Sequence, residues 1–458
     1  MAIYKKNINN IFYIFIASHL LIWTLIPTFT NHNLPLDTIE ALAWGSNLDW
    51  GFNKHPPMSA FLPEIIYFIF GPQDWAYYLL SQICIVVSFF VIFKLAEDFF
   101  ENKIYCLLSV LLLEGIYFYN FTTPEFNVNV CLIPFWSLSL FYLWKGIRNN
   151  KILDWIFLGL FAGLGFLSKY LFVYLGLAIA VLLIYLIINK KINLKCLVSL
   201  IPFLIILSPH IIWLSENDYV TITYGLMRTG LEGSNFIDHV KYPIIFLLKQ
   251  IGLLIPFFVL ILLLVKKIKF KINFKDKKLI FLIFINFLPI FLMLVTSIIT
   301  GSKIRTMWMT PFYLFFGVLF VYLFKSQINI KKLNYFLYGF LFLFFLSPIL
   351  YSYISISQTN KRTDYSGKEI ATLIERRWSK NFSNKIMYVV GDEWHAGNLS
   401  YHLSSRPIWF KSIKGKIEKL DPNGGIIYTG NSDVLKEVCP GDFGKINKQG
   451  FCMIGLKK

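Results

Sequence analysis

Charged residues are scarce in this chain. They make up 15% of its 458 residues, whereas hydrophobic residues make up 56% and the mean hydropathy is +0.59. Soluble globular domains carry about 25% charged residues. The composition therefore excludes an ordinary soluble protein and indicates a polytopic membrane protein.

Common catalytic and metal-binding motifs are absent too. The six cysteines form no CxxC pair or other metal-ligand spacing, and there is no P-loop, GxSxG or HExxH motif. Four cysteines fall in or beside apolar runs, where cysteine acts as a small hydrophobic residue: Cys84, Cys106, Cys131 and Cys196. Cys439 and Cys452 lie in a polar tail and are able to pair if that tail faces an oxidising compartment.

Long apolar runs organise most of the chain. A membrane-spanning helix needs about 20 apolar residues, and the sequence predicts about eleven spans. They cover residues 11–29, 75–95, 104–122, 127–144, 152–168, 170–188, 196–214, 244–265, 279–299, 308–325 and 333–353. No small-residue cleavage site follows the first run, so we interpret it as a retained helix rather than a removed signal peptide.

Lysines and arginines are concentrated in every second segment that connects these apolar runs. One set of connections holds most of the cations: Lys5, Lys6, Lys94, Lys103, Lys145, Arg148, Lys151, Lys190, Lys191, Lys195, Lys266, Lys267, Lys269, Lys271, Lys275, Lys277, Lys278, Lys325, Lys331 and Lys332. The other set holds fewer: Lys54, Lys169, Arg228, Lys241, Lys303 and Arg305. Because basic connections stay in the cytoplasm, the N-terminus is predicted to be cytoplasmic. The net charge of +18 is then mostly a topological signal and does not indicate nucleic-acid binding.

Two domains are predicted, in a fold that is mainly α. Residues 1–354 form a transmembrane helical bundle whose first outer loop, 30–74, carries the candidate site, and residues 355–458 form a small periplasmic α/β domain. In that tail, 366–380 has the pattern of an amphipathic helix and 434–438 that of a helical turn. Three short segments have the pattern of strands: 386–390, 407–410 and 426–429.

The first outer loop holds the densest group of ionisable residues. Asp37 and Glu40 lie three apart, so both carboxylates face the same way on one helical turn, and Trp44 extends that face. The proline pair after Lys54 and His55 holds these two residues on a stiff, non-helical corner. Acids on a helix beside a basic corner suit a substrate that carries phosphate next to a group that loses a proton. The alternative is an amphipathic connector on the membrane surface, with its charges solvated.

Further candidates lie at the outer ends of later spans. Glu125 directly follows a proline, where a carboxylate is costly unless partnered, although it also suits the positive end of the next helix. Lys169 separates two apolar runs and either snorkels to the interface or holds a phosphate there. Arg228 and Arg305 suit bidentate phosphate contacts. Trp308 fits either an interfacial aromatic belt or a platform for a sugar ring.

Together these residues resemble the polyprenyl-phosphate-sugar glycosyltransferases of the GT-C class, in the branch that joins bacterial lipid A aminosugar transferases to protein O-mannosyltransferases. The resemblance rests mainly on DTIEALAWG, LDWGF and KHPPM within residues 37–58. Thr123-Pro124-Glu125 is similar to the second acidic motif of that family, usually Thr-Pro-Asp. Later segments are similar to further signatures: Leu167-Ser168-Lys169-Tyr170, Ser208-Pro209-His210, Trp308 with Pro311, and Trp394-His395 through Arg406-Pro407.

The resemblance implies a reaction and roles for these residues. An acceptor attacks the anomeric carbon of a sugar on a lipid phosphate, with inversion, and the polyprenyl phosphate leaves. The implied catalytic acids are Asp37, as base or acceptor-orienting group, with Glu125 and Glu40. The implied donor phosphate-binding residues are Lys54, His55, Lys169, Arg228 and Arg305. The implied substrate-binding residues are Trp44, Tyr170 and Trp308.

Two departures from the family pattern stand out. Glu125 replaces the usual aspartate with a longer side chain. The aminosugar transferases carry Glu-Lys before the proline pair, where this chain has Lys54-His55. The metal site or acceptor contact described for them is therefore not carried over, and dependence on a divalent metal stays open.

The predicted function is a bacterial inner-membrane glycosyltransferase, a hexosyl or pentosyl transferase. It moves a sugar from undecaprenyl phosphate to lipid A or another envelope glycolipid on the periplasmic face. Protein hydroxyls are an alternative acceptor. A lipid-linked sugar transporter or flippase is a second alternative, but a transporter places polar groups near mid-span and has inverted repeats. Here the polar groups gather at one face and no repeat is visible.

Overall fold

The computed structural model describes residues 2–229, 235–265, 268–269, 273, 275–330, 333–413, 420–439 and 449–458, with side chains from Asn7 onward. Its helices are α1 (Ala2–Thr30), α2 (Leu36–Gly45), α3 (Met58–Phe70), α4 (Asp74–Phe99), α5 (Lys103–Leu111), α6 (Val128–Asn149), α7 (Ile152–Ser168), α8 (Phe172–Ile188), α9 (Leu200–Glu216), α10 (Val220–Thr229), α11 (Asp238–Leu264), α12 (Lys277–Thr300), α13 (Phe316–Phe324), α14 (Asn334–Ser357), α15 (Gly367–Asn381), α16 (His395–His402) and α17 (Ser432–Lys436). Short 3-10 segments are η1 (Leu112–Gly115), η2 (Tyr117–Tyr119), η3 (Leu194–Ser199), η4 (Thr306–Tyr313) and η6 (Arg362–Asp364). The strands are β1 (Ile386–Val390), β2 (Ile408–Phe410), β3 (Gly425–Gly430) and β4 (Gly450–Ile454). Of the cations used above for topology, Lys266, Lys267, Lys271, Lys331 and Lys332 lie outside the described residues, as do the side chains of Lys5 and Lys6.

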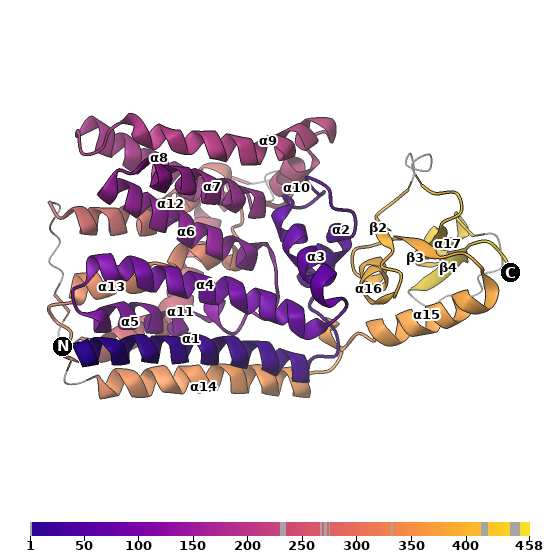
Figure 1. Cartoon of the computed structure of the whole chain (residues 1–458), viewed down its shortest axis with the longest axis horizontal. Coiled ribbons are helices and arrows are strands. Elements are labelled where there is room, and N and C mark those ends of the chain that lie inside the picture. The colour runs from indigo at the N-terminus through magenta and orange to yellow at the C-terminus, as the bar shows by residue number, and fades with distance from the viewer. Residues whose placement is uncertain are drawn as a thin grey trace.

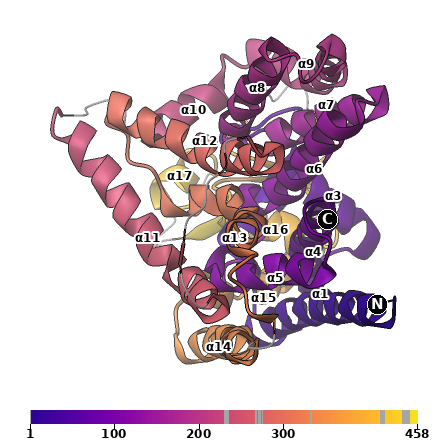
Figure 2. The same cartoon turned by 90° about the vertical axis from the view of Figure 1, so that its left-hand side faces the viewer.

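The long helices form one bundle, and the domain made of α15 to β4 lies beyond one end of it (Figure 1). Helices α2 and α3 lie between the bundle and that domain. Figure 2 looks along the bundle from the opposite end and shows α1 beside α14 along one side of it and α8 with α9 at the other. The structure thus confirms a mainly α bundle with a small α/β domain at the C-terminus.

Seven helices among the described residues are long and apolar enough to cross a membrane: α1 from Asn7, α4, α6, η3 continued by α9, α11, α12 and α14. The bent pair η4 and α13, with an angle of 53° between the two parts, makes an eighth if counted as one span. The other predicted runs are also helical but shorter or broken. Helices α7 and α8 have 17 residues each, and 104–122 is α5 followed by the 3-10 segments η1 and η2.

Burial divides these helices into an inner and an outer set. Buried residues make up 67% of the apolar stretch of α4 and 72% of that of α6, but 17% in 194–216 and 22% in α14. The poorly buried helices are as apolar as the central ones, which suits contact with lipid rather than water. Helices α4 and α6 therefore form the centre of the bundle.

The C-terminal domain is built on a four-stranded sheet in the order β2-β1-β3-β4. Strand β1 pairs in parallel with β2 and β3, and β4 runs antiparallel to β3. The predicted helix and the three predicted strands correspond to α15, β1, β2 and β3, whereas β4 was not predicted. Cys439 and Cys452 form a disulfide with Cα atoms 6.3 Å apart, which ties the chain after α17 to β4.

Arg406 fastens this domain to the helices of the first loop. Its guanidinium forms an ion pair with Glu64 of α3, donates to the backbone oxygen of Leu42 in α2 at 2.7 Å, and lies 4.2 Å from the ring of Tyr67. Both charged side chains are mostly buried, with 14% and 17% exposed. A pair this well enclosed fixes position, because removing one partner leaves the other charge without compensation.

We predict that Arg406→Ala loosens this attachment. It leaves Glu64 unpaired and should lower the free energy of unfolding by about 2 kcal/mol. Thermal unfolding and limited proteolysis of the purified protein in detergent measure the effect, with earlier cleavage expected before α15. The control is Arg377→Ala, which removes an exposed arginine from α15. Equal behaviour of the two variants would contradict the structural role of Arg406.

Candidate active site

The first turn of α2 is anchored to the segment that precedes α6. The backbone N–H of Asp37 donates to Oε1 of Glu125 at 3.2 Å, and the hydroxyl of Thr38 donates to the backbone oxygen of Phe126 at 3.1 Å. The N-cap of α2 is Pro35, whose side chain accepts no hydrogen bond. Glu125 therefore satisfies one of the free N–H groups at the start of this helix, where a negative charge is also favoured.

Two predicted acids, Asp37 and Glu125, thus meet at one point. Burial raises the pKa of Asp37, although the charges of Lys169 and Lys54 oppose this. Burial and the adjacent charge of Asp37 raise the pKa of Glu125 to about 7. Near neutral pH the pair is therefore close to sharing a single proton, an arrangement that suits proton transfer or orientation of an acceptor.

Lys169 lies on the same side of the bundle with only 7% of its surface exposed. Its ammonium donates to Oδ1 of Asn129 at 2.5 Å and lies 5.4 Å from the ring centroid of Trp308. Burial lowers the pKa of Lys169 to about 7, while the carboxylate of Asp37 opposes the shift. A desolvated cation without an ion-pair partner in the described residues gains strongly from an incoming anion.

Lys54, which was predicted to bind the donor phosphate, contacts two carboxylates in the structure. Its ammonium lies 3.0 Å from Oε1 of Glu40 and 3.2 Å from Oε1 of Glu393, so it bridges two carboxylates. Burial lowers the pKa of Lys54, but the two carboxylates raise it more. The first-loop acid and the C-terminal-domain acid are therefore joined by this lysine. Its primary contacts are structural, and its charge still acts on Asp37.

The ring of His55 packs edge-on against Trp44 and Tyr224, with centroids 5.8 and 6.5 Å away. Burial, with the charges of Lys169 and Lys54, lowers the pKa of His55 to about 3. At neutral pH this side chain is an uncharged imidazole. It can offer a hydrogen bond to a phosphate but no positive charge.

Residues of α9 and α10 hold the loop that leads to His55. Nδ1 of His210 donates to the backbone oxygen of Trp50 at 2.6 Å, so its Nε2 accepts from the hydroxyl of Tyr170 at 2.7 Å. Thr221 donates to the backbone oxygen of Phe52. Position 51 must be glycine, because any Cβ there would lie 2.3 Å from the ring of Trp213. Tyr170 is thus used to position the loop through His210.

Trp44 is enclosed rather than open to a substrate. Its indole stacks on Phe52 with centroids 5.7 Å apart and belongs to a buried cluster shared with the C-terminal domain, including Ile374 and Trp378. Its Nε1 is buried without a hydrogen-bond partner in the structure. The structure places Trp44 as packing between α2 and the C-terminal domain.

The predicted arginines, Arg228 and Arg305, line a cavity of about 650 Å³. Its charged lining residues are four cations and one acid: Arg228, Lys249, Lys303, Arg305 and Asp238. The charge of Arg228 acts on both Asp37 and His55, and that of Arg305 acts on Lys169. The cavity and the acid pair therefore form one electrostatic unit, with the excess positive charge needed for an anionic group.

Three residues near the acids were not predicted. Glu393 comes from the C-terminal domain, Asn129 from the first turn of α6, and Arg362 from η6, where its charge lowers the pKa of both Asp37 and Glu125. Two of them lie near segments that resemble the family: Asn129 follows Pro124-Glu125 closely, and Glu393 directly precedes Trp394-His395. Arg362 has no such neighbour in sequence.

The arrangement does not fit a bound metal ion. Among the described residues, no three His, Cys, Asp or Glu side chains form a cluster able to ligate one. The carboxylates of Glu40 and Glu393 are already bridged by the ammonium of Lys54. The proposed roles are therefore assigned to protein side chains.

Comparison with known proteins gives a consistent result. Residues 54–213 match the family model of dolichyl-phosphate-mannose-protein mannosyltransferase. The fold is similar to that of ArnT from Cupriavidus metallidurans bound to undecaprenyl phosphate, with a TM-score of 0.61 and 13% identity over 93% of this chain and 94% of that chain. For ArnT in the apo state the TM-score is 0.58 and the identity 12%, with the same coverage. A search of curated proteins finds no match.

The long apolar helices, in a fold similar to that of ArnT, define a multi-pass membrane protein. The family-model match over residues 54–213 and the similarity to the ArnT fold agree with the resemblance found in the sequence. The segment that matches the mannosyltransferase family begins at Lys54, within the loop that carries the acids, and ends at Trp213 in α9.

We predict that Glu393→Gln lowers the pKa of Lys54, because one of its two carboxylate partners loses its charge. Competitive acetylation of Lys54 across a pH series, followed by mass spectrometry, measures this shift in the purified protein. Glu369→Gln, at an exposed position of α15, is the control and should leave the profile unchanged. An unaltered profile in Glu393→Gln would show that the C-terminal domain does not reach Lys54.

Proposed function

We propose that this chain transfers a sugar from undecaprenyl phosphate to lipid A or another envelope glycolipid, at the periplasmic face of a bacterial inner membrane. The observation that carries the proposal is the meeting of Asp37 and Glu125 beside the buried Lys169. The ArnT structure with undecaprenyl phosphate supports a polyprenyl-phosphate donor, because that protein shares the fold. The alternation of cations along the sequence supports the membrane orientation.

The donor phosphate fits the cation-lined side of the site. In the reaction an acceptor oxygen forms a bond to the anomeric carbon from the face opposite the phosphate. The bond between that carbon and the phosphate oxygen breaks, and the electron pair leaves with the polyprenyl phosphate, so the configuration inverts. Negative charge grows on this phosphate in the transition state, and fixed cations stabilise it most strongly there.

We assign the leaving-group role chiefly to Lys169, with Arg228 and Arg305 in the adjoining cavity. Lys169 is desolvated and lacks a carboxylate in direct contact, so a nearby phosphate raises its pKa and keeps it protonated. The two arginines are always charged and give bidentate contacts. Lys54 contributes through its charge, because its own hydrogen bonds are taken by Glu40 and Glu393.

The acids act on the acceptor. A hydroxyl acceptor loses a proton as it attacks, and Asp37 takes that proton. A phosphate acceptor is already ionised and needs orientation alone. Glu125 holds the start of α2 and, through its charge, raises the affinity of the acid pair for a proton. Glu40 holds Lys54 in place.

A second candidate function is transfer to protein hydroxyls. It is favoured by the description of the family model that matches residues 54–213. The two candidates differ in the acceptor and share the donor chemistry. Mass spectrometry of lipid A and of periplasmic proteins from a deletion strain separates them, because the true acceptor loses one sugar.

We predict that Asp37→Asn and Glu125→Gln abolish transfer while membrane abundance stays unchanged. Both substitutions keep the side-chain shape and remove a negative charge of the acid pair that accepts the proton of the acceptor or orients it. The measurement is restoration of the missing sugar in the deletion strain by each plasmid-borne variant. Asp49→Asn is the control, since among the described residues that carboxylate accepts a hydrogen bond from the backbone N–H of Trp50 and from no other group. If both acid variants restore the product, the assignment of the acids is wrong.

We also predict a bell-shaped pH profile of kcat/KM centred near pH 7. Rates fall as the pH drops below about 7, because the Asp37 and Glu125 pair takes up a proton. Rates fall above about 7, because Lys169 loses its proton in the free enzyme. Lys169→Arg keeps its charge at all these pH values, so its alkaline limb should disappear even if the maximal rate is lower. An unchanged alkaline limb would exclude Lys169 as its source.

A further inference from the structure

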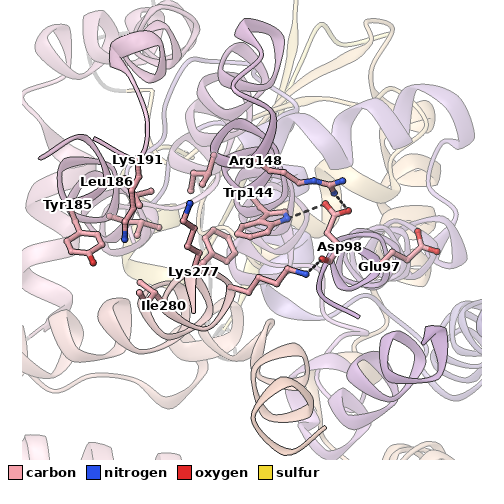
Figure 3. Close-up of a pocket in the computed structure, with 13 residues that line it drawn as sticks. Glu97, Asp98, Trp144, Arg148, Tyr185, Leu186, Lys191, Lys277 and Ile280 are labelled. Atoms are coloured by element: carbon pink, nitrogen blue, oxygen red, sulfur yellow. Dashed lines mark hydrogen bonds and ion pairs between the residues drawn. The ribbon is translucent and has the colours of Figure 1, made fainter. Parts of the chain in front are cut away.

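A second cavity lies at the end of the bundle far from the C-terminal domain. It measures about 530 Å³ and is bounded by the last turns of α4, α6 and α8, the chain just after α8, and the first turn of α12 (Figure 3). These four helices are distant in sequence and converge here. Nothing in the proposed transfer reaction uses this end of the molecule.

The acids that line this cavity are already neutralised. Asp98 forms an ion pair with Arg148 and accepts from the indole N–H of Trp144 at 3.2 Å, as Figure 3 shows. Glu97 is bound by two lysines outside the cavity lining, Lys94 at 3.0 Å and Lys103 at 2.8 Å.

The remaining cations have no carboxylate partner among the described residues. They are Lys191, after α8, and Lys277 and Lys278, in the first turn of α12. Lys278 donates to the backbone oxygen of Asp98 at 2.6 Å, and the ammonium of Lys191 lies 5.2 Å from the centroid of the Tyr185 ring. Three positive charges therefore line a cavity whose acidic side chains are already paired with other cations.

Part of the cavity wall is apolar. It is formed by Leu182 and Leu186 of α8 with Ile280 and Phe281 of α12, together with the ring of Tyr185. A small soluble anion would leave this wall in contact with water. A lipid places its phosphate among the cations and its glycerol and first methylene groups against the leucines, which buries apolar surface as well.

We propose that this cavity binds the phosphate-ester headgroup of an anionic membrane lipid. The claim is independent of the transferase reaction and rests on the three lysines, the neutralised acids and the apolar wall. A headgroup with a single phosphate diester matches a cavity of this size, and its charge is complementary to the lysines. Bound lipid contacts both α8 and α12, since residues of both helices line the cavity.

The test uses the full-length protein purified in detergent and incubated with phosphatidylglycerol, phosphatidylcholine or inorganic phosphate. Native mass spectrometry counts bound lipid, and thermal unfolding reports stabilisation. We expect phosphatidylglycerol to bind in preference to phosphatidylcholine. The triple variant Lys191→Gln, Lys277→Gln, Lys278→Gln should bind phosphatidylglycerol at least about tenfold more weakly, since each lysine contributes to anionic-lipid attraction.

The matched control is Lys151→Gln, Lys195→Gln, Lys275→Gln, which removes the same charge from exposed lysines outside the cavity lining. It should retain binding, as should the charge-preserving variant with arginine at 191, 277 and 278. Equal weakening in the glutamine control would reduce the effect to overall charge and overturn the proposal. Stabilisation by inorganic phosphate without selective phosphatidylglycerol binding would overturn it as well.

Discussion

The site depends on burying opposite charges together at the start of α2. Asp37, Glu125 and Lys169 are each costly to remove from water alone, and the attraction between Lys169 and the carboxylate of Asp37 offsets part of that cost. Glu125, whose own pKa is raised by burial and by the charge of Asp37, also accepts the backbone N–H of Asp37 and so fixes the position of α2. A shift of α2 away from Glu125 would expose an uncapped helix start and separate the charges. The hydrogen bond from Asp37 to Glu125 therefore fixes both the position of α2 and the closeness of the two acids.

The C-terminal domain completes this arrangement from the other side. Trp44 and Phe52 pack into the cluster that contains Ile374 and Trp378, so the outward face of α2 is buried by the tail. Lys54 joins Glu40 to Glu393 across the same boundary. The domain is thus a wall of the site, and its hydrophobic contact keeps water from the charges, which strengthens every electrostatic interaction inside.

Sequence patterns predicted what is local and what membrane topology brings together. The shared face of Asp37 and Glu40 follows from helical spacing, and Glu125 and Lys169 follow because both stand at span ends on one side. These sequence patterns could not predict contacts that depend on tertiary packing. Glu393 and Arg362 lie hundreds of residues from the loop, the partners of Lys54 come from two domains, and Trp44 is buried by a domain whose docking no motif specifies. The break of 104–122 into α5, η1 and η2 was missed because its composition is as apolar as that of an intact span.

The two cavities illustrate how burial, more than the number of cations, distinguishes the proposed transfer site from the proposed lipid-binding site. Each is lined by four cations. Beside the outer cavity stand acids and a lysine buried deeply enough that their pKa values move toward neutrality, where a proton can be exchanged during a reaction. At the other end the acids already have cation partners, and the lysines are exposed or half-exposed. Charges in that setting attract an anion without changing protonation, so the same residue types suit the proposed transfer at one end and the proposed lipid binding at the other.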